Sequence, residues 1–178
     1  MIIKTCFFTG EGKEKAEELF LKCKDYTPYY KKDSELLSKW TKDGFDKHIP
    51  LLFVGACGIA VRTIAPYLKD KLMDSPVLVM DEKGQYVIPV LSGHLGGANE
   101  LAKELATVIG GTPVITTATD IQNIFSVDVF AKKNGLQIKN REGIRMVTGK
   151  LLSGQKADIS IDPTIETVMD GFPKELTI

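Results

Sequence analysis

The stretch VLVMDEKGQYVIPVLSGHLGGANELAKELATVIG, residues 77–110, carries in one continuous run the signals that decide the fold. Two apolar segments, Val77–Met80 and Tyr86–Leu91, flank the turn-forming residues 81–85, which predicts two strands joined in a hairpin. In Ala98–Ile109 apolar side chains recur at helical spacing and Gly110 follows, which predicts a helix that ends at this glycine. A glycine-rich loop, SGHLGG, joins the second strand to the helix.

The rest of the chain extends this alternation in both directions. Strands are predicted at residues 2–8, 51–54, 114–116 and 136–138, and helices at 13–24, 34–40, 59–68, 126–134 and 141–152. Strands that alternate with helices predict an α/β fold, with a mostly parallel sheet flanked by helices and the one hairpin as its antiparallel element. The pattern weakens after residue 120, and the last part predicts an incomplete second α/β unit.

Composition and charge exclude several classes of protein. The chain has 178 residues, of which 43% are hydrophobic and 26% are charged, as in a globular protein. Its 23 basic and 23 acidic residues balance, so no nucleic-acid partner is expected. The longest apolar run, residues 49–61, is shorter than the roughly 20 residues of a membrane-spanning helix. With no secretory signal either, a cytoplasmic location is expected.

The three cysteines, Cys6, Cys23 and Cys57, have no paired spacing. An odd number argues against a disulfide framework and fits a reducing compartment. The absence of metal-ligand spacing argues against a zinc site, so no bound metal is expected.

The loop at residues 92–97 is the first candidate site. Gly96 and Gly97 allow a sharp turn, and free amides at the start of the next helix suit a carboxylate or phosphate. The positive helix end disfavours imidazolium, so His94 is expected to be neutral near pH 7, as a general base must be. Ser92 or Asn99 would hold its ring or orient a water. The alternative, a turn that merely contains a histidine, stays open.

A second candidate loop follows the strand at Leu51–Val54. Cys57 would start a helix there, which makes a thiolate conceivable, although a small residue that fills a tight turn is the simpler interpretation. Arg62 is expected among apolar residues, where it would pair with an internal acid or with a ligand carboxylate.

A third candidate loop ends at Asp120, which is expected to cap the next helix or to take part in acid–base chemistry. Ligands bind outside the carboxyl ends of strands in such sheets, so the three loops are expected to converge on one rim. Asp81 and Glu82 are expected to be solvated in the hairpin turn, and His48 to be exposed. The glycines near residue 10 match neither nucleotide-binding motif, because Lys15 stands at the third glycine position of the dinucleotide fingerprint.

The order of these segments is more specific than any one of them. Residues 54–120 resemble the amino-terminal domain of the CbiG family of cobalamin biosynthesis, the cobalt-precorrin-5A hydrolases, and residues 127–138 continue the likeness. The matching blocks, with x for positions outside the pattern, are GxxGIxVR (55–62), DExG (81–84), LSGHxGGAN (91–99) and VITTATD (114–120).

The resemblance implies a hydrolase that opens the δ-lactone of a cobalt-bound tetrapyrrole and releases acetaldehyde. Cobalt would arrive in the substrate, so no cofactor is expected; a homo-oligomer stays open. The alternative is a non-catalytic tetrapyrrole-binding module, and a nucleotide-binding protein comes third. Residues and resemblance together assign catalysis to His94 and Asp120, and substrate binding to Gly55, Gly58, Arg62, Ser92, Gly93, Gly96, Gly97 and Asn99.

Members of this family are longer than this chain. The resemblance therefore implies an amino-terminal domain over residues 1–134 and the truncated start of a middle domain over residues 135–178. The family's carboxy-terminal domain is expected to be absent.

Overall fold

The computed structural model describes residues 1–70, 73–122, 124–158, 160, 162 and 176–177. It divides into two compact units, residues 1–115 and residues 116–178, and each is described by itself. The resemblance implies a boundary between two domains of the family after residue 134. This is a different division from that of the compact units, and it stays a prediction.

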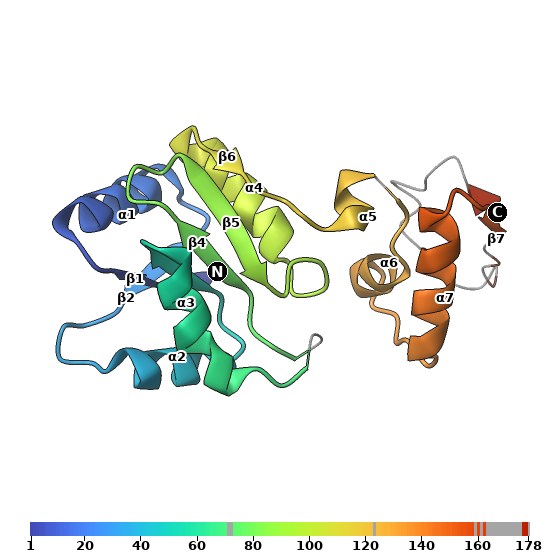
Figure 1. Cartoon of the computed structure of the whole chain (residues 1–178), viewed down its shortest axis with the longest axis horizontal. Coiled ribbons are helices and arrows are strands. Elements are labelled where there is room, and N and C mark those ends of the chain that lie inside the picture. The colour runs from blue at the N-terminus through green and yellow to red at the C-terminus, as the bar shows by residue number, and fades with distance from the viewer. Residues whose placement is uncertain (71–72, 123, 159, 161, 163–175, 178) are drawn as a thin grey trace. The chain divides into compact units, whose positions relative to one another are not determined.

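The first unit is built on a six-stranded sheet in the order β2-β1-β3-β4-β5-β6 (Figure 1). Strands β1 to β4 run parallel, β5 is antiparallel to β4, and β6 is parallel to β5. The predicted α/β fold with a mostly parallel sheet and one hairpin is confirmed. The strands are β1 (Ile2–Phe7), β2 (Thr27–Tyr30), β3 (Leu51–Val54), β4 (Val77–Met80), β5 (Tyr86–Leu91) and β6 (Thr112–Pro113).

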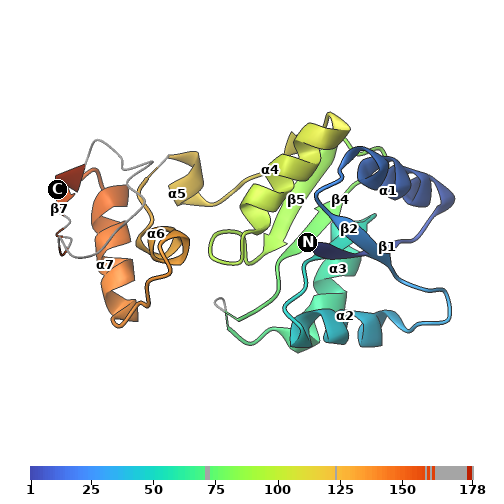
Figure 2. The same ribbon diagram turned by 180° about the vertical axis from the view of Figure 1, so that it is seen from behind.

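Helices cover both faces of this sheet (Figure 2). Helices α1 (Gly10–Lys22) and α4 (Ala98–Ile109) pack on the face that receives Leu52 and Val54. Helices α2 (Leu37–Asp46) and α3 (Cys57–Ile64) pack on the other face. Strand β3 is buried on both sides because its side chains alternate between two apolar layers, which explains its uninterrupted apolar sequence.

Several predicted elements of the first unit differ in their bounds. The second helix spans Leu37–Asp46 rather than residues 34–40. The helix predicted at 59–68 is α3 and then a short 3₁₀ helix, η1 (Ala65–Tyr67), because Pro66 cannot continue the α-helical hydrogen bonds. Strand β2 was not predicted, and β6 lies two residues before its predicted position.

The second unit is mainly helical over its described residues. It contains α5 (Ala118–Ile121), α6 (Val127–Lys133), α7 (Arg141–Leu152) and the paired strands β7 (Ala157–Asp158) and β8 (Leu176–Thr177). The side chain of Asn140 caps α7 by accepting a hydrogen bond from the Gly143 amide at 3.0 Å. The strand predicted at 136–138 is wrong, since these residues are irregular. No helix within the described residues is both long and apolar enough to cross a membrane.

Candidate functional site

The loop between β5 and α4 folds back onto the first turn of the helix. The Ala98 amide donates to the Ser92 carbonyl at 3.1 Å, and the Asn99 amide donates to the Gly93 carbonyl at 2.8 Å. These two amides were expected to be free for an anionic ligand, and that prediction is wrong. The physical reason is that the loop's own carbonyls satisfy the donors that a helix start leaves unpaired.

The glycines of this loop are required by close contacts. A Cβ atom on Gly96 would lie 2.4 Å from the Ser92 Cβ and 2.5 Å from the Ser92 carbonyl oxygen, and one on Gly93 would lie 2.5 Å from the Asn99 Oδ1. Gly97 has a φ of 88°, in the left-handed region that favours glycine. Asn99 is only 2% exposed and its side chain lies against Gly93, and its role in substrate binding stays a prediction.

Replacing Gly96 by alanine is therefore expected to lower the free energy of unfolding by about 1–3 kcal/mol, because the new methyl group overlaps the Ser92 backbone. Urea unfolding followed by circular dichroism measures this change. Gly58→Ala is the matched control: its Cβ meets nothing within 4 Å, so it is expected to leave stability unchanged or raise it by up to about 1 kcal/mol. Equal effects at both glycines would contradict the packing of the loop.

Ser92 and His94 have different surroundings in this loop. The Ser92 hydroxyl donates to the Asp74 carbonyl at 2.7 Å, which ties the loop to the segment before β4. Ser92 itself has a φ of 54°, an uncommon value for a residue with a side chain. His94 is partly buried, so its ring belongs neither to the apolar core nor to the fully exposed surface. The catalytic role of His94 stays a prediction.

The two strand-end loops of the first unit lie at opposite edges of the sheet. Because β5 is antiparallel to β4, Leu91 pairs with Val77 at the start of β4, while Val87 pairs with Met80 at its end. The His94 loop therefore lies where β3 and β4 begin, and the loop with Gly55 lies where β3 ends. The prediction that they converge on one rim is wrong, because the hairpin reverses the direction of β5.

At the opposite edge, the predicted residues have mainly structural surroundings. Gly55 has a φ of 148°, and a Cβ there would lie 2.9 Å from the ring of Phe8. Gly58 is exposed near the start of α3. Arg62 is also exposed, and no described carboxylate pairs with it, so the expectation that it sits among apolar residues is wrong. An exposed arginine remains open to a ligand but needs no internal partner.

Two acids of the hairpin turn do more than face solvent. Asp81 accepts hydrogen bonds from the Lys83 amide at 2.9 Å and the Tyr86 amide at 2.6 Å, which shapes the turn. Glu82 accepts a hydrogen bond from the Thr9 hydroxyl at 2.5 Å, and Thr9 also caps α1. The sequence predicted neither role, because Thr9 and Glu82 are far apart along the chain.

Asp120 lies inside the short helix α5 of the second unit. The N-cap of that helix is Thr117, and the next helix begins at Val127, so the expectation that Asp120 caps a helix is wrong. Its catalytic role stays a prediction.

The cysteines differ in accessibility. Cys6 and Cys23 are buried and Cys57 is partly exposed, and all three are free thiols. Burial raises the pKa of Cys6 to about 12, which disfavours the thiolate. Within the described residues, no cluster of three or more histidine, cysteine or acidic side chains is arranged to hold a metal ion.

Ellman's reagent is expected to modify Cys57 alone in the folded protein, and all three cysteines in denaturant, because the other two thiols are 1% and 4% exposed. Absorbance of the released thiolate counts the reacted groups. Cys57→Ser supplies the control and should abolish the native reaction. Two or more equivalents released under native conditions would contradict the packing around Cys6 and Cys23.

Comparisons with known proteins find similar sequences for this region of the chain. Residues 39–120, which contain the His94 loop, match the family model described as "Cobalamin synthesis G N-terminal". The cobalt-precorrin-5A hydrolase of Salmonella typhimurium is 42% identical over 119 residues, 66% of this chain and 34% of that protein. That of Priestia megaterium is 43% identical over 112 residues, 63% of this chain and 30% of that protein.

Two archaeal proteins extend the similarity along the chain. A probable cobalt-precorrin-5A hydrolase of Methanocaldococcus jannaschii is 30% identical over 167 residues, 90% of this chain and 48% of that protein. The crystal structure of a cobalamin biosynthesis protein G homolog from Sulfolobus solfataricus has a TM-score of 0.57 at 27% identity. The match covers 99% of this chain and 52% of that one.

The chain thus spans between 30% and 48% of the length of the three curated relatives. The motifs around Gly55, His94 and Asp120 all lie within the matched residues 39–120. Residues 39–120 are accordingly identified as an N-terminal domain of the cobalamin synthesis G family.

Proposed function

We propose that this chain forms part of a cobalt-precorrin-5A hydrolase of cobalamin biosynthesis. The observation that carries the proposal is the 42–43% identity to two hydrolases of that name, over 119 and 112 residues. The proposed substrate is a cobalt-containing tetrapyrrole whose lactone ring is opened with loss of acetaldehyde. The metal belongs to the substrate in this proposal, and the protein needs no cofactor of its own.

In the proposed reaction, water adds to the lactone carbonyl while His94 accepts its proton. Collapse of the tetrahedral oxyanion breaks the ring C–O bond and gives a carboxylic acid, which ionises, and an alkoxide on the two-carbon fragment. The alkoxide oxygen then forms the carbonyl of acetaldehyde as the C–C bond to the macrocycle breaks, and the ring carbon keeps that electron pair and takes up the proton that His94 accepted. The oxyanion needs a hydrogen-bond donor. The amides of Ala98 and Asn99 are already bonded to loop carbonyls, so this donor has to come from another group.

A second candidate function is a tetrapyrrole-binding module whose chemistry depends on further parts of the protein. The observation that favours it is the short span of the chain relative to the curated hydrolases. For either function we propose a cytoplasmic location, which fits three free thiols, and a small-molecule partner rather than a nucleic acid, which fits the balanced charge.

Incubation of the purified chain with cobalt-precorrin-5A separates the two candidates. Binding is followed by the visible spectrum of the corrinoid, and acetaldehyde is measured by coupled oxidation of NADH with alcohol dehydrogenase. A spectral change with acetaldehyde release supports the hydrolase. A spectral change alone supports the binding module, and neither signal would contradict both.

A further inference from the structure

A cavity of about 550 Å³ opens in the first unit. It lies between the end of α2, the 3₁₀ helix η1 and the segment that leads into β4. Its volume falls within the roughly 300–1,000 Å³ that is typical of small-molecule sites. The lining residues are Lys42, Phe45, Asp46, His48, Pro66, Tyr67, Lys69, Asp70, Met73 and Asp74.

Aromatic rings form the apolar part of this cavity. The rings of Phe45 and Tyr67 lie 6.0 Å apart between centroids, at an interplanar angle of 44°. The Tyr67 hydroxyl donates to the Ser38 carbonyl at 3.0 Å, which fixes the orientation of the ring. Met73, which is 57% exposed, adds a polarizable thioether. Such a surface suits a flat, largely apolar ring system.

The charged residues of the cavity leave a cationic side chain available. Asp46 already forms an ion pair with Lys42, and the Asp74 carboxylate accepts the Lys69 backbone amide at 3.0 and 3.3 Å. Among the described residues no salt bridge to the Lys69 ammonium or to the exposed imidazole of His48 is formed, and Lys69 interacts with Asp46 only at longer range, where it helps to lower the pKa of that carboxyl. Both side chains can therefore receive an acidic group of a ligand.

The cavity is joined to the His94 loop through one hydrogen bond. Asp74 lines the cavity, and its carbonyl oxygen accepts the Ser92 hydroxyl at 2.7 Å. A ligand seated in the cavity would thus lie beside the loop that carries the candidate base, at the same edge of the sheet.

We propose that this cavity binds one edge of the tetrapyrrole, with the ring over Phe45 and Tyr67 and a carboxylate arm at Lys69 and His48. This inference rests on the proposed function and names the binding surface for its substrate. The cavity is too small for a whole macrocycle, so the rest of the ring extends beyond it. Free carboxylate arms are recognised, and amidated arms are not.

The test uses the whole chain and two cobalt corrinoids: cobyrinic acid, with free carboxylate arms, and cobinamide, with amidated arms. Binding is titrated by visible absorption. The chain is expected to bind cobyrinic acid at least about tenfold more tightly, and Lys69→Glu is expected to weaken that binding about tenfold while changing cobinamide binding little. Tyr67→Ala is expected to weaken both corrinoids about threefold to tenfold.

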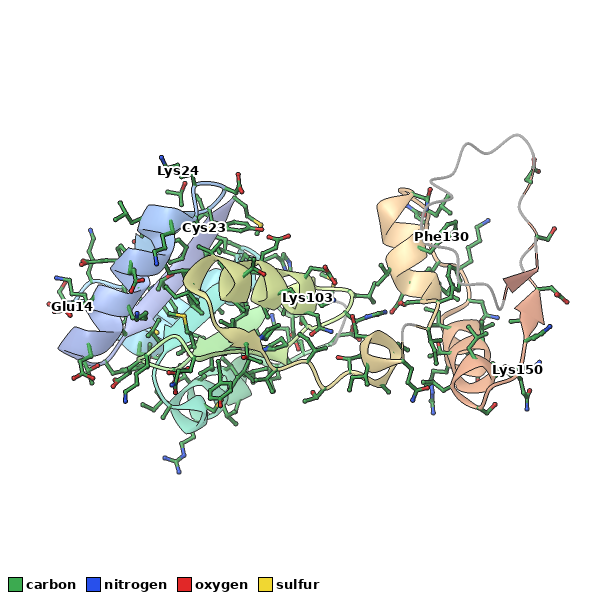
Figure 3. All side chains as sticks on the ribbon, turned by 90° about the horizontal axis from the view of Figure 1, so that it is seen from above. Glu14, Cys23, Lys24, Lys103, Phe130 and Lys150 are labelled. Atoms are coloured by element: carbon green, nitrogen blue, oxygen red, sulfur yellow. The ribbon has the colours of Figure 1, made fainter. Side chains whose placement is uncertain are left out.

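Lys24→Glu is the matched control, an exposed lysine just beyond α1 on the other face of the sheet (Figure 3). Circular dichroism verifies that each variant is folded. If cobyrinic acid binds but Lys69→Glu behaves like Lys24→Glu, the cavity is not the site and the proposed function stands. If the two corrinoids bind equally well, carboxylate recognition at Lys69 is wrong. If neither corrinoid binds the wild-type chain, both the inference and the proposed function fail.

Discussion

Replacing His94 by alanine is expected to lower kcat for lactone hydrolysis about 10²- to 10⁴-fold in the protein that carries this chain, the loss typical of a missing general base. The loop around this residue is fixed by the Ser92–Asp74 hydrogen bond and by two hydrogen bonds that backbone amides of α4 donate to loop carbonyls. The loss should therefore reflect the missing imidazole and not a collapsed loop. Acetaldehyde release measures the rate. The same substitution should leave the titration of a cobalt corrinoid unchanged, because the base acts in the reaction and not in binding.

Lys103→Ala is the matched control for His94→Ala. Lys103 lies on α4, the helix that follows the loop, and pairs with Glu100 at the surface (Figure 3). Its removal is expected to leave kcat unchanged. An unchanged kcat in His94→Ala would remove this residue from the mechanism.

Replacing Asp43 by alanine is expected to lower the free energy of unfolding by about 3 kcal/mol, because it leaves a buried ammonium group without its anion. Lys4 is 2% exposed in the central part of the sheet, and its Nζ lies 2.7 Å from the Asp43 carboxylate. The rings of Tyr29 and Trp40 lie 5.4 and 5.3 Å from the same Nζ, which stabilises the cation only in part. Denaturant unfolding measures the change.

Two substitutions isolate the cause of this effect. Asp46 lies on the same helix, and its carboxylate pairs with the exposed Lys42. Asp46→Ala is therefore expected to lower the free energy of unfolding by less than about 1 kcal/mol. Lys4→Met removes the buried charge itself and is expected to be nearly neutral, since Asp43 is 40% exposed and retains Lys47 at 2.6 Å. Equal losses for Asp43→Ala and Asp46→Ala would show that the buried position of Lys4 is irrelevant.

The same pair gives stability a defined dependence on pH. The hydrogen bond from Lys4, followed by that from Lys47, lowers the pKa of Asp43 below its usual value of 3.8. The folded state therefore holds this carboxylate ionised more strongly than the unfolded chain does. The resulting stabilisation is fully present above the unfolded pKa and is lost as the pH falls through the lower folded pKa. Asp43→Ala should weaken this acid dependence.

Local signals predicted several elements to the residue. Strands β3, β4 and β5 and helices α4 and α7 have the predicted bounds. In each case the limits depend on neighbouring residues, such as Gly110, whose φ of 76° ends α4. The apolar strands can be predicted without knowledge of their neighbours in the sheet, because each is a short apolar run between turn residues.

The parts that the sequence did not predict depend on residues far apart along the chain. The Lys4–Asp43 pair spans 39 residues, and the Thr9–Glu82 hydrogen bond spans 73. Strand β2, TPYY, has alternating exposure at the edge of the sheet and pairs only with β1, so it lacks the apolar run of a central strand. The cavity beside the His94 loop is likewise assembled from segments that no single motif connects.

The free amides predicted at the start of α4 illustrate a different limit. The sequence shows that a helix follows a glycine-rich loop, but it does not show whether that loop turns back to use the helix donors. Here the Ser92 and Gly93 carbonyls use two of them. His94 could be singled out from the sequence, whereas its immediate electrostatic surroundings depend on how the loop closes.

The reversal of β5 also affects how sequence change can accumulate in this domain. Strand β3 has four residues, so the Gly55 and His94 rims are separated by more than about 10 Å of rigid sheet. Substitutions so far apart with no shared neighbours combine additively. Substitutions in one loop therefore do not change the effect of substitutions in the other. The two loops can evolve separately on the same sheet.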